Sequence, residues 1–299
     1  MNKKIAYLFL FFSSLTFAQF DNLDLTPADS LMQEGKIEDA IAEFEANYKQ
    51  GNREAIYLYN YACALAEDNQ IDKSFAVLQE SLDLILRLNP LFDPDFLNLR
   101  TDKRWNSFED ELISKIELKY KTKIIDKEYA KKLWKMRALD QAYYFQIHLA
   151  ERKIGKNTTV VNTLWKVKNN INKENLENLE KLIRQKGFPK KSLVGNNAAQ
   201  AAFLIIQHAD LQTQKKYASI IEDLCKKKEA DSQSFAYLYD RIEVSENRPQ
   251  KYGTQVKYNK EKKQYEVYPL IDKEKVDFWR NDIGLTPLSD YLSGYGIKM

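Results

Sequence analysis

The stretch from Leu25 to Leu84 repeats itself with a spacing of 34 residues. The matching pairs are Ala28 and Ala62, Leu31 and Leu65, Ile37 and Ile71, Glu38 and Asp72, Ala40 and Ser74, and Phe44 and Leu78. A small residue on one helix lets a second helix approach, and a large apolar residue fills the remaining gap. The spacing therefore predicts stacked pairs of antiparallel helices. Two pairs cannot bury a continuous core alone, because roughly three are needed, so we expect a further segment to cover the open end.

These residues resemble the tetratricopeptide repeat, whose small and large apolar positions they match. The glycine that usually follows the leucine of the first helix and the closing alanine are only partly present, and coincidental pairing of helices is the alternative. The covering segment is expected at Asn89 to Ile116, where Asp93 and Pro94 start a short helix and a longer helix begins at Trp105. We predict a tetratricopeptide-like module over residues 19–118.

The N-terminus has the pattern of a signal peptide. A short basic start precedes an apolar run from Ile5 to Phe12, and small residues lead up to Ala18. We predict that residues 1–18 are cleaved and that the mature chain, starting at Gln19, is exported to the periplasm or secreted. A membrane anchor is the alternative, but the apolar run is shorter than the roughly 20 residues that span a bilayer.

Composition favours a mainly α-helical fold and limits the partners. Glycine and proline number only 9 and 7, whereas a β-sandwich would need many turns. Loss of the leader removes Lys3 and Lys4 from 46 basic residues and leaves the rest nearly balanced against 43 acidic ones. A nearly neutral surface argues against nucleic acid or an anionic membrane as partner. The two cysteines, Cys63 and Cys225, are expected to be buried small side chains, with a disulfide as the alternative.

Residues 126–299 are predicted to form a second, mostly helical domain. Asp126 is expected to cap a long helix on which Asp140, Tyr144 and His148 share one solvent-facing line. Separate helices are expected at 159–169 and 172–186, the latter capped by Asn172, and three more at 196–209, 211–227 and 232–244. A β-hairpin is predicted near 253–268, and two short helices finish the chain.

Several polar groups in this domain follow or interrupt apolar runs. Gln207-His208-Ala209-Asp210 follows the apolar residues 198–206, and Asp240-Arg241 and Gln250-Lys251-Tyr252-Gly253-Thr254-Gln255 come later. A buried polar group without a partner costs free energy. Such groups therefore mark either a site or a fully hydrogen-bonded core network.

These motifs resemble an uncharacterised bacterial family that is catalogued only as a domain of unknown function. The other matching residues are Asp140-Gln141, Gly187-Phe188-Pro189, Val194-Gly195, Arg280 and Gly284-Leu285. The resemblance covers roughly residues 126–292 and implies no assigned activity. Members often carry a basic residue three positions after the Asp-Gln pair, where this chain has Tyr144, so a site that used the basic residue would be altered here.

The candidate site is centred on His208, because histidine is a natural general base near neutral pH. Asp210 or Asp240 is expected to orient its ring and Arg241 to hold an anion. A hydrogen-bonded core position for His208 and an N-cap role for Asp210 are the alternatives. We expect His208, Asp240, Arg241 and Gln255 to converge. The candidate ligand-binding residues are Asp140, Gln141, Gln207, Asp210, Gln250, Tyr252, Thr254, Gln255 and Arg280.

The sequence leaves two classes of function open. It contains no nucleophile elbow, phosphate-binding glycine loop, zinc-binding helix or paired carboxylates, and we predict no metal and no cofactor. The first possibility is an exported binding protein that holds a protein or peptide on its helical repeats and a small polar ligand in its second domain. The second is a hydrolase-like enzyme with His208 as general base.

Overall fold

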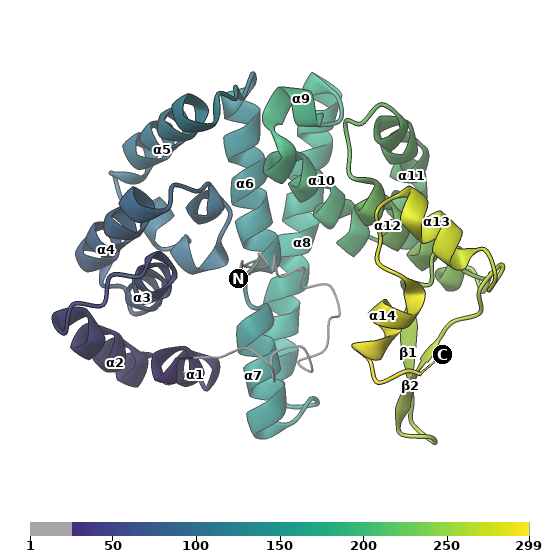
Figure 1. The fold of residues 1–299 in the computed structure, drawn as a ribbon, viewed down its shortest axis with the longest axis horizontal. Helices are drawn as coiled ribbons and strands as arrows, with labels where there is room; N and C mark the ends of the chain where they lie inside the picture. The colour runs from purple at the N-terminus through teal and green to yellow at the C-terminus, as the bar shows by residue number, and fades with distance from the viewer. Residues whose placement is uncertain (1–25, 299) are drawn as a thin grey trace, which may run out of the picture. The chain divides into compact units, whose positions relative to one another are not determined.

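The computed structural model describes residues 26–298 and is mainly α-helical, as predicted. The chain divides into two compact units, one over Leu25–Leu238 and one containing Tyr239–Met299 (Figure 1). The predicted signal peptide, residues 1–18, lies outside the described residues. The predicted domain border between residues 118 and 126 falls within the first unit and stays a prediction.

The first four helices form two hairpins. These helices are α1 (Pro27–Gln33), α2 (Ile37–Lys49), α3 (Ala55–Glu67) and α4 (Ile71–Leu84). Helix α1 packs against α2, and α3 packs against α4. Ala62 and Ser74 are fully buried, and the Ser74 hydroxyl donates a hydrogen bond to the carbonyl of Ala62 at 2.8 Å. Two of the small residues in the 34-residue spacing therefore lie in the contact between α3 and α4.

Three 3₁₀ turns and a helix follow: η2 (Asn89–Leu91), η3 (Pro94–Phe96), η4 (Leu99–Thr101) and α5 (Trp105–Tyr120). As predicted, Asp93 caps the turn η3, accepting a hydrogen bond from the amide of Asp95 at 3.1 Å, with Pro94 in the first position. The turn packs against α3, and Phe96 is fully buried. This segment therefore adds apolar side chains to the core of the second hairpin.

Three helices form the core of the segment that follows: α6 (Lys127–Gln141), α8 (Thr159–Lys186) and α10 (Asn196–His208). Each packs against the other two. Asp126 caps α6, as predicted, by accepting a hydrogen bond from the amide of Tyr129 at 2.9 Å, and Tyr129 and Trp134 are buried. The remaining helices are α7 (Tyr144–Ile154), α9 (Lys191–Val194), α11 (Leu211–Lys226) and α12 (Ser232–Ser245), and α12 crosses the border between the two units.

Two expectations for this segment are wrong. The helix expected to carry Asp140, Tyr144 and His148 is interrupted, because Tyr143 adopts a left-handed φ of 71° between α6 and α7. Asp140 is therefore not part of a solvent-facing line and is only 1% exposed. The second error concerns α8, which is a single helix of 28 residues. Asn172, the expected cap, lies inside it and accepts a hydrogen bond from Nζ of Lys168, one turn earlier, at 2.7 Å.

The C-terminal unit contains the predicted hairpin. Strands β1 (Val256–Asn259) and β2 (Gln264–Val267) are antiparallel. Two short helices follow, α13 (Val276–Asp282) and α14 (Leu288–Ser293), and Val276 and Leu288 are buried in a small core with the side chain of Leu292. Gly253 adopts a φ of 70°, and a Cβ there would lie 2.6 Å from a methyl carbon of Leu288. Both constraints require glycine at the approach to β1.

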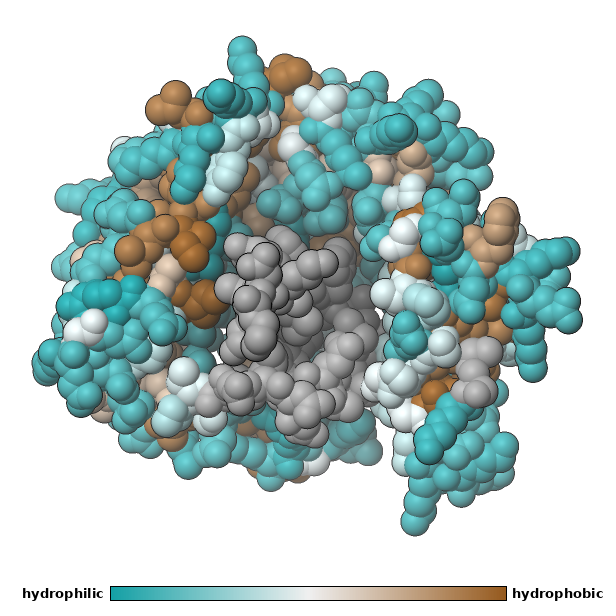
Figure 2. Space-filling view, viewed as in Figure 1, coloured by the Kyte–Doolittle hydropathy of each residue, from teal (hydrophilic) through white to brown (hydrophobic). Residues whose placement is uncertain are grey.

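Among residues 26–298, no helix is both long and apolar enough to cross a bilayer. Figure 2 shows mainly hydrophilic residues on the face it displays, with apolar residues in small groups. Scattered exposed apolar residues are normal on folded proteins and need no special explanation.

Candidate functional site

A buried Asp–His pair joins the C-terminal ends of α6 and α10. Asp140 is the last but one residue of α6 and His208 is the last residue of α10, so the packing of these helices brings the two side chains together. Nδ1 of His208 lies 2.9 Å from Oδ1 of Asp140, and the two side chains are 11% and 1% exposed. An ionised carboxylate only accepts hydrogen bonds. Nδ1–H therefore donates to Asp140, and in the neutral ring Nε2 is the acceptor.

The other ring nitrogen of His208 is the open end of this pair. Nε2 has no hydrogen-bond partner among residues 26–298, and part of the side chain remains exposed. An imidazole that is oriented by a buried carboxylate and open at Nε2 can accept a hydrogen bond or a proton from a ligand.

A lysine and a glutamine complete the surroundings of Asp140. Lys168 of α8 is fully buried, and its ammonium group donates to the main-chain carbonyl of Asp140. The side-chain amide of Gln141 donates to Oδ2 of Asp140 at 2.7 Å. Burial alone would raise the pKa of Asp140, but His208, Lys168 and Gln141 outweigh this effect and hold the pKa below its usual 3.8. Burial lowers the pKa of Lys168, and the Asp140 carboxylate opposes that shift.

Tyr144 lies among three other rings beside the pair. Its ring centroid is 6.1 Å from that of His208, 6.3 Å from that of Trp165 and 6.4 Å from that of His148. Nζ of Lys168 lies 4.6 Å from the same centroid. The position expected to hold a basic residue in related sequences is thus aromatic here, and Lys168 places a positive charge against its ring.

Two predicted residues next to His208 make contacts within the fold. Gln207 is buried, and its main-chain carbonyl accepts a hydrogen bond from the side chain of Gln214 at 3.0 Å. Asp210 caps α11, accepting from the amide of Thr213 at 2.9 Å, which is the alternative that the sequence offered. The carboxylate at Nδ1 of His208 is that of Asp140, which we did not expect there, because the packing of α6 on α10 is a long-range feature. Of the two expected partners, Asp210 caps α11, and Asp240 belongs to the other unit, so its pairing with His208 stays a prediction.

A second polar cluster, in the C-terminal unit, surrounds Asp240. Its fully buried carboxylate accepts hydrogen bonds from the amides of Lys251 at 2.8 Å, Tyr252 at 3.0 Å and Thr254 at 2.9 Å. The hydroxyl of Thr254 donates a further bond at 2.9 Å. Burial raises the pKa of Asp240, although these hydrogen bonds oppose the shift. Asp240 therefore fixes the loop 250–255 that leads into β1.

Other predicted residues hold the same loop. The Gln250 side chain donates to the carbonyl of Gln255 at 2.9 Å and accepts from the Gln255 amide at 2.9 Å. Arg280, only 1% exposed, donates to the carbonyls of Tyr252 and Thr286, both at 2.6 Å. Arg241 is half-buried on α12 beside Asp240. The convergence expected for His208, Asp240, Arg241 and Gln255 joins residues of the two units and stays a prediction.

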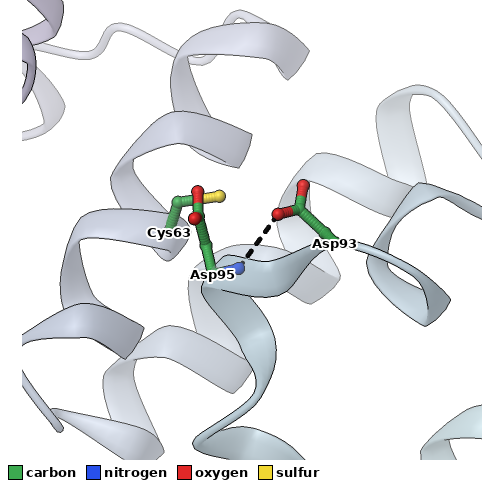
Figure 3. Close-up of side chains that lie close together, drawn as sticks. All are labelled: Cys63, Asp93 and Asp95. Atoms are coloured by element: carbon green, nitrogen blue, oxygen red, sulfur yellow. Dashed lines mark hydrogen bonds between the residues drawn. The ribbon is translucent and has the colours of Figure 1, made fainter. Parts of the chain in front are cut away.

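A third polar group was not predicted from the sequence. Cys63 on α3 lies with Asp93 and Asp95 at η3, and one Sγ and two carboxylate oxygens all lie within 4.8 Å of one another (Figure 3). The hydroxyl of Tyr59 donates to Asp93 at 2.7 Å. Burial raises the pKa of the Cys63 thiol and of the Asp95 carboxyl, and the neighbouring negative groups add to both shifts. Sequence analysis missed this group because the cysteine and the acids are distant in the chain.

The fold and these contacts define a mainly helical protein whose motif residues build a buried Asp–His pair and a separate aspartate-centred loop cluster. A model described as a family of unknown function, DUF6624, matches residues 127–299, which is more than half of the chain. The chain therefore belongs to the DUF6624 family, in agreement with the resemblance of its motifs to a domain of unknown function. No curated protein and no solved structure showed a significant match to the chain. The N-terminal hairpins are consistent with tetratricopeptide-like repeats.

Proposed function

We propose that this protein is a binding protein whose DUF6624 part recognises a small polar ligand at Nε2 of His208. The observation that carries the proposal is the 2.9 Å hydrogen bond between Nδ1 of His208 and Asp140, with Nε2 unpartnered among residues 26–298. A hydrogen bond from Nδ1–H to a buried carboxylate fixes the orientation of the ring and makes Nε2 a better acceptor. The pair is thus preorganised to meet a hydrogen-bond donor of the ligand.

The surroundings of the pair narrow the chemistry of the ligand. An acceptor at Nε2 selects a donor such as a hydroxyl or amide group. The buried ammonium of Lys168 lies against the ring of Tyr144, which itself contacts His208. This positive charge offsets that of the ionised Asp140 carboxylate, so the pair has little net charge with which to attract an ion. A ligand that carries hydroxyl groups, such as a sugar or a hydroxy acid, fits these constraints.

Two substitutions of His208 separate ligand recognition from support of Asp140. The side-chain amide of asparagine can take the place of Nδ1–H, so His208→Asn keeps a donor for Asp140 and removes the acceptor at Nε2. In His208→Gln the side-chain amide reaches the position of Nε2, and Asp140 loses the hydrogen-bond donor that Nδ1–H provides. We expect a screen of sugars, hydroxy acids and short peptides by thermal shift and calorimetry to give a ligand that wild type binds and His208→Asn does not. His148→Ala is the control, because its side chain is more exposed, at 36%, and its Nδ1 lies near Glu151 rather than Asp140.

Unchanged binding by the folded His208→Asn variant would overturn this proposal. If His208→Asn binds the ligand as tightly as wild type while remaining folded, Nε2 is not part of the recognition site. Stability of the variant is checked by urea unfolding, so that loss of binding through unfolding is distinguished from loss of the acceptor.

For the N-terminal hairpins we propose a tetratricopeptide-like module that binds a protein or peptide, in a chain exported through its signal peptide. The support is the 34-residue spacing and the burial of its small residues at Ala62 and Ser74. A peptide array probed with the full chain tests it. Bound peptides should be lost when residues on the exposed side of the hairpins are replaced, and retained in the His208 variants.

A hydrolase-like enzyme is the second candidate, favoured by the geometry of the same pair. A histidine held at Nδ1 by a carboxylate can remove a proton at Nε2. Among residues 26–298, the side chain of His208 interacts with Asp140 and with the ring of Tyr144, and neither is an activated serine or cysteine. A water molecule would therefore be the nucleophile. Turnover of the bound ligand by wild type and its loss in His208→Asn would favour the enzyme. Binding without turnover supports the binding protein.

A further inference from the structure

We propose that Cys63, Asp93 and Asp95 form a binding site for one zinc ion. The three side chains come from two separate elements, the helix α3 and the turn η3, which pack against each other. The proposed recognition site at His208 uses none of these three residues, so either proposal can fail without the other.

The distances between the possible ligand atoms suit a metal ion. In zinc sites the metal lies about 2.3 Å from a cysteine sulfur and about 2.0–2.2 Å from a carboxylate oxygen, in tetrahedral geometry. Ligand atoms around such an ion are therefore about 3.3–3.8 Å apart. In this structure the sulfur and the two oxygens all lie within 4.8 Å of one another.

The direction of the Cys63 thiol is an independent indication of a ligand. Cys63 is only 4% exposed, and a buried free cysteine usually packs as a small apolar side chain. Figure 3 shows its sulfur turned toward the two aspartates instead. Within residues 26–298, no hydrogen bond joins this thiol to a group outside the cluster. The thiol and the two carboxylates therefore face one another in one enclosed group, which is how the ligands of a metal ion are arranged.

No basic side chain among residues 26–298 forms a direct ion pair with the cluster, although the charges of Arg137 and Arg87 oppose the rise that burial causes in the pKa of Asp93. Asp93 is oriented by the hydroxyl of Tyr59 at 2.7 Å and by the amide of Asp95 at 3.1 Å. Such hydrogen bonds fix the ligating carboxylate in known metal sites, where they are part of the support around the metal. Metal binding displaces the protons of its thiol and carboxyl ligands, so a divalent cation would take their place and balance the two carboxylates and the thiolate.

The mixture of sulfur and oxygen identifies the metal class. Calcium and magnesium take oxygen ligands almost exclusively, whereas zinc accepts both cysteine sulfur and carboxylate oxygen. Three protein ligands would leave one position of a tetrahedral ion for water or another small ligand, which is the arrangement of zinc sites that are not purely structural.

Titration of the full chain with zinc and with cobalt tests this proposal, on protein purified without a polyhistidine tag and kept reduced. We expect one zinc ion per chain by native mass spectrometry. Cobalt should give a thiolate-to-metal charge-transfer absorption band in wild type and in the control Cys225→Ser. The band should be absent in Cys63→Ser, and Asp95→Asn should weaken zinc binding at least tenfold.

Two results would overturn the zinc site: no stoichiometric zinc binding by wild type, or binding that survives unchanged in Cys63→Ser. Far-ultraviolet circular dichroism establishes that each variant is folded. If Cys63→Ser does not fold, the half-buried Asp95→Asn decides alone, and unchanged zinc affinity in that variant rejects the site. Loss of zinc binding does not alter the ligand test at His208, so failure of one proposal is distinguishable from failure of the other.

Discussion

A carboxylate as deeply buried as that of Asp140 is stable only if other groups satisfy its oxygens. His208 and Gln141 each donate to one oxygen, and Lys168 adds a positive charge at the neighbouring carbonyl. The same hydrogen bond that satisfies Asp140 also orients the imidazole. Stability and orientation are therefore coupled in this pair, and only the acceptor at Nε2 is left for a ligand.

The lowered pKa of Asp140 predicts an acid-dependent stability. Because the pKa in the folded chain lies below the unfolded value of 3.8, the unfolded chain binds more protons in that range. The contribution of Asp140 is thus fully present above pH 3.8 and is lost as the pH falls through its folded pKa. Urea unfolding of wild type and Asp140→Asn at several pH values measures this. Their difference in unfolding free energy should shrink below pH 3.8, and a difference that stays constant there contradicts the account.

Sequence reasoning selected Asp140, Gln141 and His208 but not their pairing. Each was visible as a polar residue within a motif at the end of an apolar run. The pairing depends on α6 and α10 lying side by side, although Asp140 and His208 are 68 residues apart. No local pattern encodes such a contact. Lys168 was missed for a related reason, because a lysine within a charged helical stretch is normally solvated.

At the scale of helices, local signals in the sequence predicted where a helix begins better than where it is interrupted. The caps at Asp93, Asp126 and Asp210 were readable because a cap acts on amides two or three residues away. The break before α7 was not readable, since Tyr143 is neither glycine nor asparagine, the residues that usually adopt its left-handed conformation. The continuity of α8 was missed because Asn172 was interpreted as a cap, although no glycine or proline interrupts residues 159–186.

The contact between α3 and α4 predicts the effect of enlarging Ala62. This residue is fully buried, and its carbonyl accepts a hydrogen bond from the Ser74 hydroxyl. A leucine side chain would therefore fit only if α3 and α4 moved apart. We expect Ala62→Leu to lower the free energy of unfolding by about 1–3 kcal/mol. Ala46→Leu on the exposed side of α2 is the matched control and should change it by less than about 0.5 kcal/mol. Equal unfolding curves for wild type and Ala62→Leu would show that the helices do not meet at this position.

The loop 250–255 depends on Asp240 of α12. Removing its carboxylate leaves the buried amides of Tyr252 and Thr254 without acceptors, at about 1–3 kcal/mol each. Asp240→Ala should therefore destabilise the chain by about 3–5 kcal/mol. Asp210→Ala removes an exposed cap and should cost only about 0.5–2 kcal/mol. Chemical denaturation measures both, and similar losses for the two variants would refute a buried network around Asp240.

For the whole chain, composition and pattern predicted the fold class, and the motifs predicted the family. Scarce glycine and proline pointed to helices, and the collinear motifs after residue 126 agree with membership of DUF6624. The division into units at residue 239 was not foreseen, because it falls within the continuous helix α12 rather than in a linker. Domain borders inside a helix leave no compositional signal of the kind that linkers give.

The N-terminal pattern predicts the length of the mature protein. Residues 1–18 combine a basic start, an apolar run and small residues before Gln19. Protein recovered after export should begin at Gln19, by N-terminal sequencing or intact mass. Recovery of the chain with these 18 residues attached would reject the cleaved signal peptide.

The central claim is that Asp140 holds His208 in one tautomer with Nε2 open as acceptor. Nitrogen-15 NMR of the histidine side chains, recorded where the His208 ring is neutral, tests it most directly. We predict a protonated Nδ1 and an unprotonated Nε2 for His208 in wild type, and loss of this preference in Asp140→Asn. The signals of His148 serve as the internal reference, since its side chain is more exposed. A protonated Nε2 in the neutral ring of wild-type His208 would contradict the claim, because Nε2 would then be unable to accept a donor from the ligand.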